Sequence, residues 1–308
     1  MKKLILLLAI IGITNVYAQQ DPLFSQYMFN KLAINPGYAG SRESLSADIL
    51  YRYQWVNIDG APKTLSASLH SPLRNQHIGL GFTAYNDRIG PTNMTGAFGT
   101  FAYRIFFPKS TLSFGLQLGA RYSNLDKSRL HAHNPNDPFL LYDQARKFAP
   151  DANFGVYYYS DRYYLGISSK QLFGNTIITV NTGQEGQDKQ FYRLAQHFYG
   201  MAGLAIPMSR EVTFRPSLLA KFTPNAPAQL DFNASFLFSD LLWLGVSYRT
   251  EKALSAIAEL YVTNNLKVGY SYDIWLNELK VLNKGSHEIR LSVDLNVVNS
   301  RMRTPRYF

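Results

Sequence analysis

The chain has 308 residues, a formal net charge of +10 at pH 7 and no cysteine, which excludes disulfides, thiolate metal sites and thiol nucleophiles. Its basic residues are spread along the sequence instead of forming one patch, which argues against nucleic acid as a partner. Beyond the first 18 residues no apolar stretch reaches the roughly 18 residues of a membrane-spanning helix.

The chain begins with a segment typical of a secretory signal peptide. Two lysines precede an apolar run at 4–13, and Val16-Tyr17-Ala18 provides the small-x-small pattern of a cleavage site. No cysteine follows, so lipoprotein processing is excluded. We therefore expect residues 1–18 to be removed and the mature chain to begin at Gln19.

Residues 19–43 come next, and their apolar side chains follow a helical spacing. Asn35-Pro36-Gly37 would end such a helix, so we expect a short helix followed by a turn. The candidate residues of this segment are Pro22, Leu23, Phe24, Tyr27, Met28, Asn35 and Pro36.

From residue 44 onward, apolar and polar side chains alternate with the period of two that β-strands show. In 286–297, for example, Ile289 and Leu291 alternate with Arg290 and Ser292. This pattern predicts fourteen strands. They lie at about 44–55, 64–71, 77–86, 93–106, 110–125, 151–160, 162–173, 196–207, 212–222, 228–238, 241–250, 253–263, 266–275 and 286–297.

The links between these strands differ in length in a regular way. Every even-numbered strand up to the twelfth is followed by a short turn, whereas long links follow the first, fifth, seventh and thirteenth, the longest near 126–150 and 174–195. This alternation is typical of outer-membrane barrels. We therefore predict an all-β fold, a transmembrane antiparallel β-barrel of about 14 strands over 44–298, with apolar faces toward lipid. A secreted β-sandwich, whose strands also alternate, is the alternative.

Strand counting also predicts where the chain ends lie. With an even number of strands and a periplasmic start, both termini would be periplasmic. Residues 19–43 would then form a partial plug or an exposed periplasmic leader. Residues 299–308 would form a periplasmic arm that contacts an acidic partner, or a disordered end. The candidate contact residues of the arm are Arg301, Arg303, Arg306, Tyr307 and Phe308.

Charged residues of both signs fall on the polar faces of the predicted strands. Unpaired charges in a confined lumen are costly, so a packed network of ion pairs is one expectation and a hydrated pore wall is the other. The candidate lumen charges are Asp48, Arg52, Arg121, Arg215, Asp231, Arg249, Glu259, Arg290 and Asp294.

We find no arrangement that predicts catalysis. Ser66, Ser68 and His70 share the inward phase of one strand, whereas a barrel lipase would need them on its outer face. Ion binding in the loops 126–150 and 174–195 stays open, although turn formation explains their residues as well. We therefore predict no enzyme, no catalytic residue, no cofactor, no metal site and no small-molecule substrate.

Four stretches of the chain resemble the PorP/SprF family of outer-membrane proteins of the type IX secretion system. They are DPLFSQYMFNKLAINPGYAGS at 21–41, YRYQWVNIDGAP at 51–62, GSHEIRLSV at 285–293 and TPRYF at 304–308. The resemblance implies a fourteen-stranded barrel in outer-membrane lipid. It also implies a role in exporting, or holding at the surface, proteins with a type IX C-terminal signal domain.

The same resemblance implies two kinds of protein partner. One is the periplasmic ring of the secretion machine, and the other is a large secreted adhesin with a C-terminal signal domain, as in gliding bacteria. The alternative function is a barrel that transports a small or hydrophobic solute.

Overall fold

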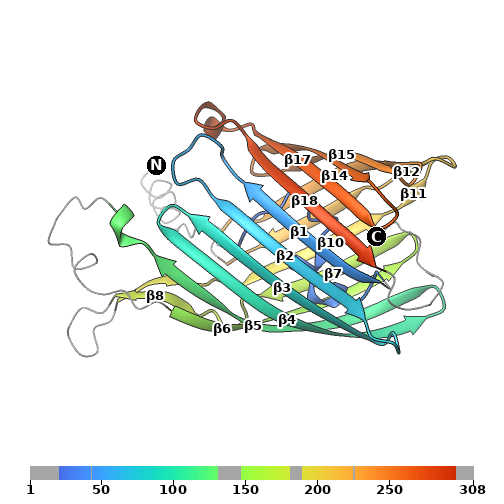
Figure 1. Ribbon diagram of the computed structural model, residues 1–308, viewed down its shortest axis with the longest axis horizontal. Helices are drawn as coiled ribbons and strands as arrows, with labels where there is room; N and C mark the ends of the chain where they lie inside the picture. The colour runs from blue at the N-terminus through green and yellow to red at the C-terminus, as the bar shows by residue number, and fades with distance from the viewer. Residues whose placement is uncertain (1–20, 43, 131–146, 181–188, 225, 296–308) are drawn as a thin grey trace, which may run out of the picture.

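The computed structural model describes residues 21–42, 44–130, 147–180, 189–224 and 226–295. Its strands form a single closed antiparallel barrel, shown in Figure 1. The sheet has sixteen strand segments, of which β11 and β12 are short pieces in line with β10 and β13, so the wall has 16 − 2 = 14 strands. The predicted barrel and its strand number are confirmed.

The strands follow one another around the barrel in chain order, and β1 pairs with both β2 and β18 to close it. The first seven are β1 Leu45–Tyr53, β2 Lys63–Pro72, β3 Ile78–Ile89, β4 Thr92–Phe107, β5 Ser110–Leu125, β6 Lys147–Ser160 and β7 Tyr163–Lys170. The others are β10 His197–Leu204 with β11 Ile206–Pro207, β12 Val212–Phe214 with β13 Ser217–Phe222, β14 Gln229–Phe238, β15 Leu242–Arg249, β16 Ala253–Tyr261, β17 Leu266–Trp275 and β18 Ser286–Leu295. A separate hairpin consists of β8 Thr176–Val180 and β9 Lys189–Arg193.

The two faces of the wall differ as the alternation predicts. On β18, the side chains of Ile289 and Leu291 are 53% and 44% exposed, whereas Arg290 and Ser292 are 0% exposed. Apolar side chains thus cover the outside and polar ones face the lumen, which is the reverse of a soluble protein. The sandwich alternative does not fit this distribution.

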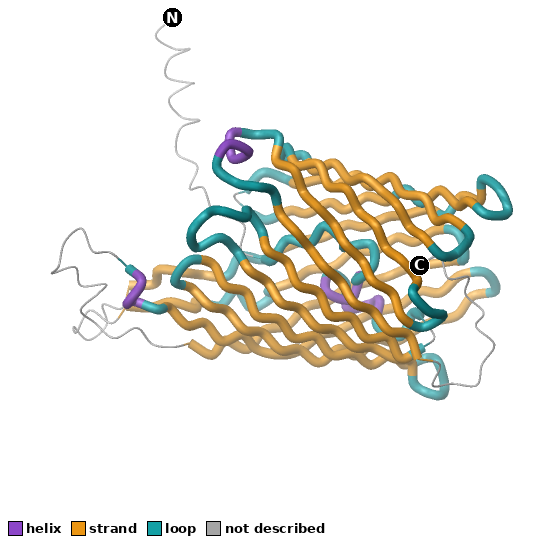
Figure 2. Tube along the Cα trace, turned by 45° about the horizontal axis from the view of Figure 1, so that its top comes forward, coloured by secondary structure: helices purple, strands orange, loops and turns teal. Residues whose placement is uncertain are grey.

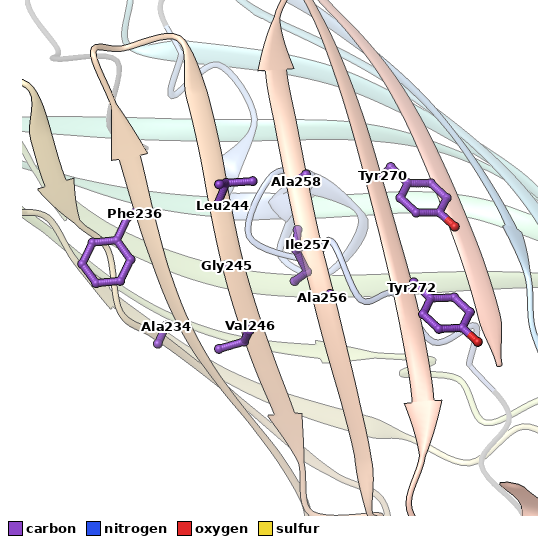
Figure 3. A pocket seen from close by; sticks show the side chains of 10 residues that line it. All are labelled: Ala234, Phe236, Leu244, Gly245, Val246, Ala256, Ile257, Ala258, Tyr270 and Tyr272. Carbon is purple, nitrogen blue, oxygen red and sulfur yellow. The ribbon is translucent and has the colours of Figure 1, made fainter.

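The outer face also carries a shallow apolar groove, which spans β14 to β17. Its volume is about 430 Å³, and it forms where the small side chains of Ala256 and Ala258 on β16 stand between Phe236 on β14 and Tyr270 on β17 (Figure 3). Its lining is apolar, as expected of a surface that meets lipid chains.

The two ends of the barrel differ in their links. We call one end the turn mouth, where the links include 73–77, 108–109 and 161–162. We call the other the loop mouth, where the links include 54–62, 126–146, 171–196 and 276–285. The loops and turns are separated in this way in Figure 2.

Two local predictions differ from the structure. The sixth strand begins at Lys147 instead of 151, because it pairs with the long β5 as far as Ser123. The helix expected within 19–43 is absent from the described part of that segment, which has only the 3-10 turns η1 Lys31–Ala33 and η2 Pro36–Tyr38. Among the described residues, no helix has the length and apolar character needed to cross a membrane.

Arginine on the outer wall tests the assignment of the two faces. We expect Leu291→Arg to lower the free energy of unfolding by about 2–4 kcal/mol, because Leu291 lies midway along β18 and faces lipid. Leu276→Arg, just beyond the end of β17, should cost only about 0–1 kcal/mol. Urea titration of the barrel in phospholipid vesicles measures both, and equal losses would contradict a lipid-facing Leu291.

Candidate functional site

Residues 21–42, which we call the lumen segment, run through the inside of the barrel. At the loop mouth, the Asp21 carboxylate is 2.7 Å from Nζ of Lys170, the last residue of β7. At the turn mouth, the Arg42 guanidinium is 3.1 Å from the carboxylate of Asp294, near the end of β18. The turns η1 and η2 lie between these ends, surrounded by strands (Figure 2).

This path places the two described ends of the chain at opposite mouths. Asp21 lies at the loop mouth and Leu295 lies at the turn mouth. The chain termini themselves lie outside the described residues, so the expectation that both are periplasmic stays a prediction. Strand counting locates only the start of β1, and the segment before β1 runs back along the full lumen.

The first set of contacts joins the lumen segment to β1, β17 and β18. The Ser25 and Gln26 backbone N–H groups donate to the Glu288 carboxylate at 3.0 and 2.8 Å. Arg52 donates to Glu288 at 3.0 Å and to Asp273 at 2.7 Å. These contacts explain the missing helix, because the wall supplies partners that helical backbone bonds would otherwise provide.

A second set of contacts surrounds Arg290, whose side chain is fully buried. Its guanidinium forms ion pairs with Asp48 on β1 and Glu259 on β16. The guanidinium carbon also lies 5.3 Å from the centre of the Phe29 ring. One arginine therefore joins two neighbouring regions of the wall to the lumen segment.

A third set of contacts lies near the turn mouth. Asp294 accepts from Arg42, from Lys267 at 2.5 Å and from the Ser46 hydroxyl at 2.6 Å. The Arg42 guanidinium also donates to the Phe29 backbone carbonyl at 3.0 Å. The end of the lumen segment is thus joined to both strands of the closing seam, β1 and β18.

A fourth set of contacts holds the start of the segment. The Asp21 carboxylate accepts from the Gln171 amide at 2.7 Å and from the Tyr199 hydroxyl at 2.9 Å, besides its ion pair with Lys170. Arg121 lies 4.0 Å from Asp21 and 3.4 Å from Asp151. Asp21 therefore faces a group of cations that the wall concentrates at the loop mouth.

The structure brings the nine candidate lumen charges into the barrel interior, and all except the half-buried Asp294 are buried. Eight of them take part in ion pairs, including Arg249 with Asp231 at 3.1 Å. The ninth, Arg215, places its guanidinium carbon 3.7 Å from the centre of the Trp243 ring. This arrangement agrees with the expected network of ion pairs.

The candidate residues of the lumen segment lie in three zones. Pro22, Leu23 and Phe24 are half-buried near the loop mouth, whereas Tyr27 and Met28 are buried among lumen residues. The Asn35 amide donates to the backbone carbonyls of Val156 at 2.9 Å and Ile167 at 3.1 Å, and its side-chain oxygen accepts from the Gly37 N–H. Pro36 follows in η2.

Glycines in the wall let the lumen segment approach the strands closely. A Cβ on Gly115 would lie 2.2 Å from the Gly37 nitrogen, and one on Gly79 would lie 2.1 Å from the Ala39 carbonyl oxygen. Such distances are not possible for non-bonded atoms, so these positions require glycine while the segment is in place.

Two of the three residues considered for catalysis, Ser68 and His70, contact the lumen segment instead. The Ser68 hydroxyl donates to the Asn30 side-chain oxygen at 3.1 Å, and Nδ1 of the buried His70 accepts from the Gly40 N–H at 3.1 Å.

No group of metal-ligating side chains is found in the described residues. The candidate arm residues, 301–308, and the middle of the 126–150 loop lie outside the described residues.

Several residues of the network were not predicted as site residues. They are Asp21, Ser25, Gln26, Lys31, Arg42, Lys267 and Glu288. Lys31 is the clearest, because its buried Nζ donates to the Met28 carbonyl at 2.9 Å and lies 4.7 Å from the centre of the Tyr164 ring. The sequence feature that could have identified Lys31 as a site residue was its position as a lysine within an apolar pattern.

Comparison with known proteins agrees with this architecture. The family model described as type IX secretion system membrane protein PorP/SprF matches residues 16–293. No curated protein matches the chain.

Several solved outer-membrane barrels are similar in structure. The toluene transporter TbuX of Ralstonia pickettii has a TM-score of 0.51 and 8% identity, covering 86% of this chain and 92% of that chain. The toluene transporter TodX of Pseudomonas putida has a TM-score of 0.47 and 10% identity, covering 86% and 93%. The outer membrane protein Omp33 of Acinetobacter baumannii has a TM-score of 0.45 and 7% identity, covering 82% and 99%. At these identities, the similarity to TbuX supports the fold alone.

Removing Arg290 tests the buried network. We expect Arg290→Met to lower the free energy of unfolding by about 3–5 kcal/mol, because Asp48 and Glu259 would lose their shared cation in the interior. Neutralising both acids in the same chain, as D48N and E259Q, should recover part of the lost free energy of unfolding. Arg74→Met in an exposed turn is the control and should change stability by less than about 0.5 kcal/mol. A loss equal to that of the control would show that the network does not stabilise the barrel.

Substitution of a wall glycine tests the docking of the lumen segment. We expect Gly115→Val to displace the segment, so that trypsin cleaves the folded barrel after Lys31, which is buried in the native chain. Gly99→Val is the matched control, because its Cβ would meet nothing closer than 4.0 Å. Resistance of the Gly115 variant to trypsin would contradict the close packing described above.

Proposed function

Because the chain belongs to the PorP/SprF family of type IX secretion system membrane proteins, we propose that it acts as a non-enzymatic component of this system in the outer membrane. It would support the export or surface attachment of proteins that carry a type IX C-terminal signal domain. Its family and fold are those of membrane barrel proteins. Outer-membrane lipid surrounds the wall, whose exposed outer face is apolar.

The filled lumen is the observation that carries this proposal. The lumen segment contacts β1, β6, β7, β17 and β18 from one mouth to the other. A barrel interior that is packed with ion-paired protein leaves its two mouths as the surfaces available to partners. Binding at the mouths therefore agrees better with the structure than passage of a solute through the lumen.

We further propose that the two mouths meet different partners. The loop mouth, with the long links 126–146 and 171–196, would face the cell surface and meet the exported protein. The turn mouth would face the periplasm, where the arm 299–308 with its arginines would contact a component of the secretion ring. In this orientation, Asp21 lies on the surface side.

Transport of a small or hydrophobic solute is the function that this proposal has to exclude. A transporter of this architecture would need the lumen segment to move aside. Such a movement would break the ion pairs of Asp21 with Lys170 and of Arg42 with Asp294, and each broken pair would leave a charge in the interior. It would also remove the backbone N–H groups that bind the buried Glu288 carboxylate.

Affinity purification separates the two functions. The affinity tag is inserted between Ser209 and Arg210 at the turn mouth, and the barrel is purified from gently solubilised outer membranes. We expect ring components and a protein with a C-terminal signal domain to copurify with it, as identified by mass spectrometry. Deletion of 301–308 should remove the ring components and keep the barrel inserted. Recovery of the barrel alone, together with solute flux through it in liposomes, would contradict the proposal and support transport.

A further inference from the structure

A polar pocket of about 330 Å³ opens at the loop mouth, beside the link 54–62. Its lining includes an aromatic side chain, one acid, two glycines and three cations. Among these residues are Tyr53, Asp59, Lys63, Gly90, Arg88 and Arg129. The pocket lies away from the lumen segment and takes no part in the network described above.

The cations of this pocket lie together without a matching number of acids. Lys63 on β2 is directly opposite Arg88 on β3, and both side chains are exposed on the outer face. Like charges in opposite positions of neighbouring strands destabilise a sheet. Arg129 adds a third cation, and none of the three forms an ion pair among the residues that the structure describes.

Two acids lie near these cations. Asp59 lines the pocket, so the four charged lining residues have a net charge of 3 − 1 = +2. Asp126 stands near Arg88 and Arg129, but its carboxylate accepts from the Ser128 hydroxyl at 2.6 Å and from the Ser128 N–H at 3.1 Å. The bond from the Ser128 hydroxyl lowers the pKa of Asp126, as do Arg129 and Arg88, so this carboxylate stays charged. Counting Asp126 with the four lining residues leaves a net charge of 3 − 2 = +1, so the cations are still in excess.

Backbone contacts give the pocket a defined shape. The Gly90 N–H donates to the Gly60 carbonyl at 2.8 Å, and the Arg129 guanidinium donates to the Gly90 carbonyl at 3.2 Å. The backbone φ angle is positive at both glycines, 71° at Gly60 and 54° at Gly90, and this conformation favours glycine. The links that carry the cations are therefore held against each other.

The height of the pocket on the barrel points to the lipid headgroups. Tyr51 is exposed on the outer wall, and Tyr53 follows it at the end of β1. Nζ of Lys63 lies 4.6 Å from the centre of the Tyr53 ring. Outward-facing aromatic residues mark the membrane interface of barrels, so cations beside them lie at the level of lipid phosphates.

We propose that this pocket binds the phosphate group of a membrane lipid in the leaflet at the loop mouth. A phosphate monoester carries about −1.5 to −2 charges at pH 7, which matches the net charge of the lining residues. Two guanidinium groups suit its oxygens, because arginine binds phosphate with paired hydrogen bonds. The lipid would offset the repulsion between Lys63 and Arg88.

Lipid binding by the purified full-length barrel in phosphatidylcholine nanodiscs tests this proposal. The probe is lipid A, which is compared with the same lipid after removal of its phosphates. We expect the K63Q/R88Q/R129Q variant to bind lipid A at least about tenfold more weakly than the native chain. The native chain should show a similar preference for the phosphorylated form.

The matched control is Arg210→Gln, an exposed arginine at the turn mouth, which should bind lipid A as the native chain does. The electrophoretic shift between heated and unheated samples confirms that each variant is folded. The proposed site would be wrong if Arg210→Gln weakened lipid A binding as much as the triple substitution does. It would also be wrong if the native chain bound the dephosphorylated lipid as tightly as lipid A. Competition by inorganic phosphate at the same concentration as lipid A would show a site for free anions and would overturn the assignment to a lipid.

Discussion

Charge pairing inside a closed barrel is the constraint on which the rest of this structure depends. A wall that turns its apolar faces outward must turn its polar faces inward, and here those faces carry arginines, lysines and carboxylates. With a second stretch of chain filling the interior, water cannot solvate these charges, so each needs a protein partner. Arg290 and Asp21 show the result, since each one joins groups that are far apart in the sequence.

The filled interior also connects the fold to the proposed function. Residues of the lumen segment use backbone N–H groups, an amide and carboxylate contacts to occupy the interior, and wall glycines give them room. The surfaces available to macromolecules are then the loops, the turns and the outer wall. The loop mouth combines long links with a cationic pocket on its rim, and the turn mouth carries the end of β18.

The sequence predicted the wall well and its contents poorly, for a physical reason. Period-two alternation is a local property of each strand, and the lengths of the links are visible directly, so the strand number and the lipid-facing side followed from them. The contact of Ser25 with Glu288 joins residues 263 positions apart, which no local pattern reports. The helical spacing around Tyr27 and Met28 was real, but the wall supplied other hydrogen-bond partners and the helix did not form. Arg42 was missed because its partner Asp294 is 252 positions away, and the Tyr164 ring beside Lys31 is likewise far from it in the sequence.

The threaded path of residues 21–42 constrains the order in which the molecule can be built. The seam between β1 and β18 closes the barrel around this segment, which is in contact with both strands of the seam. A segment that enters at one mouth and leaves at the other would have to be drawn lengthwise through a wall that had already closed. The simplest route places it against the curved, still open sheet before β18 arrives. Residues 21–42 would then act as an internal template on which the last strand closes.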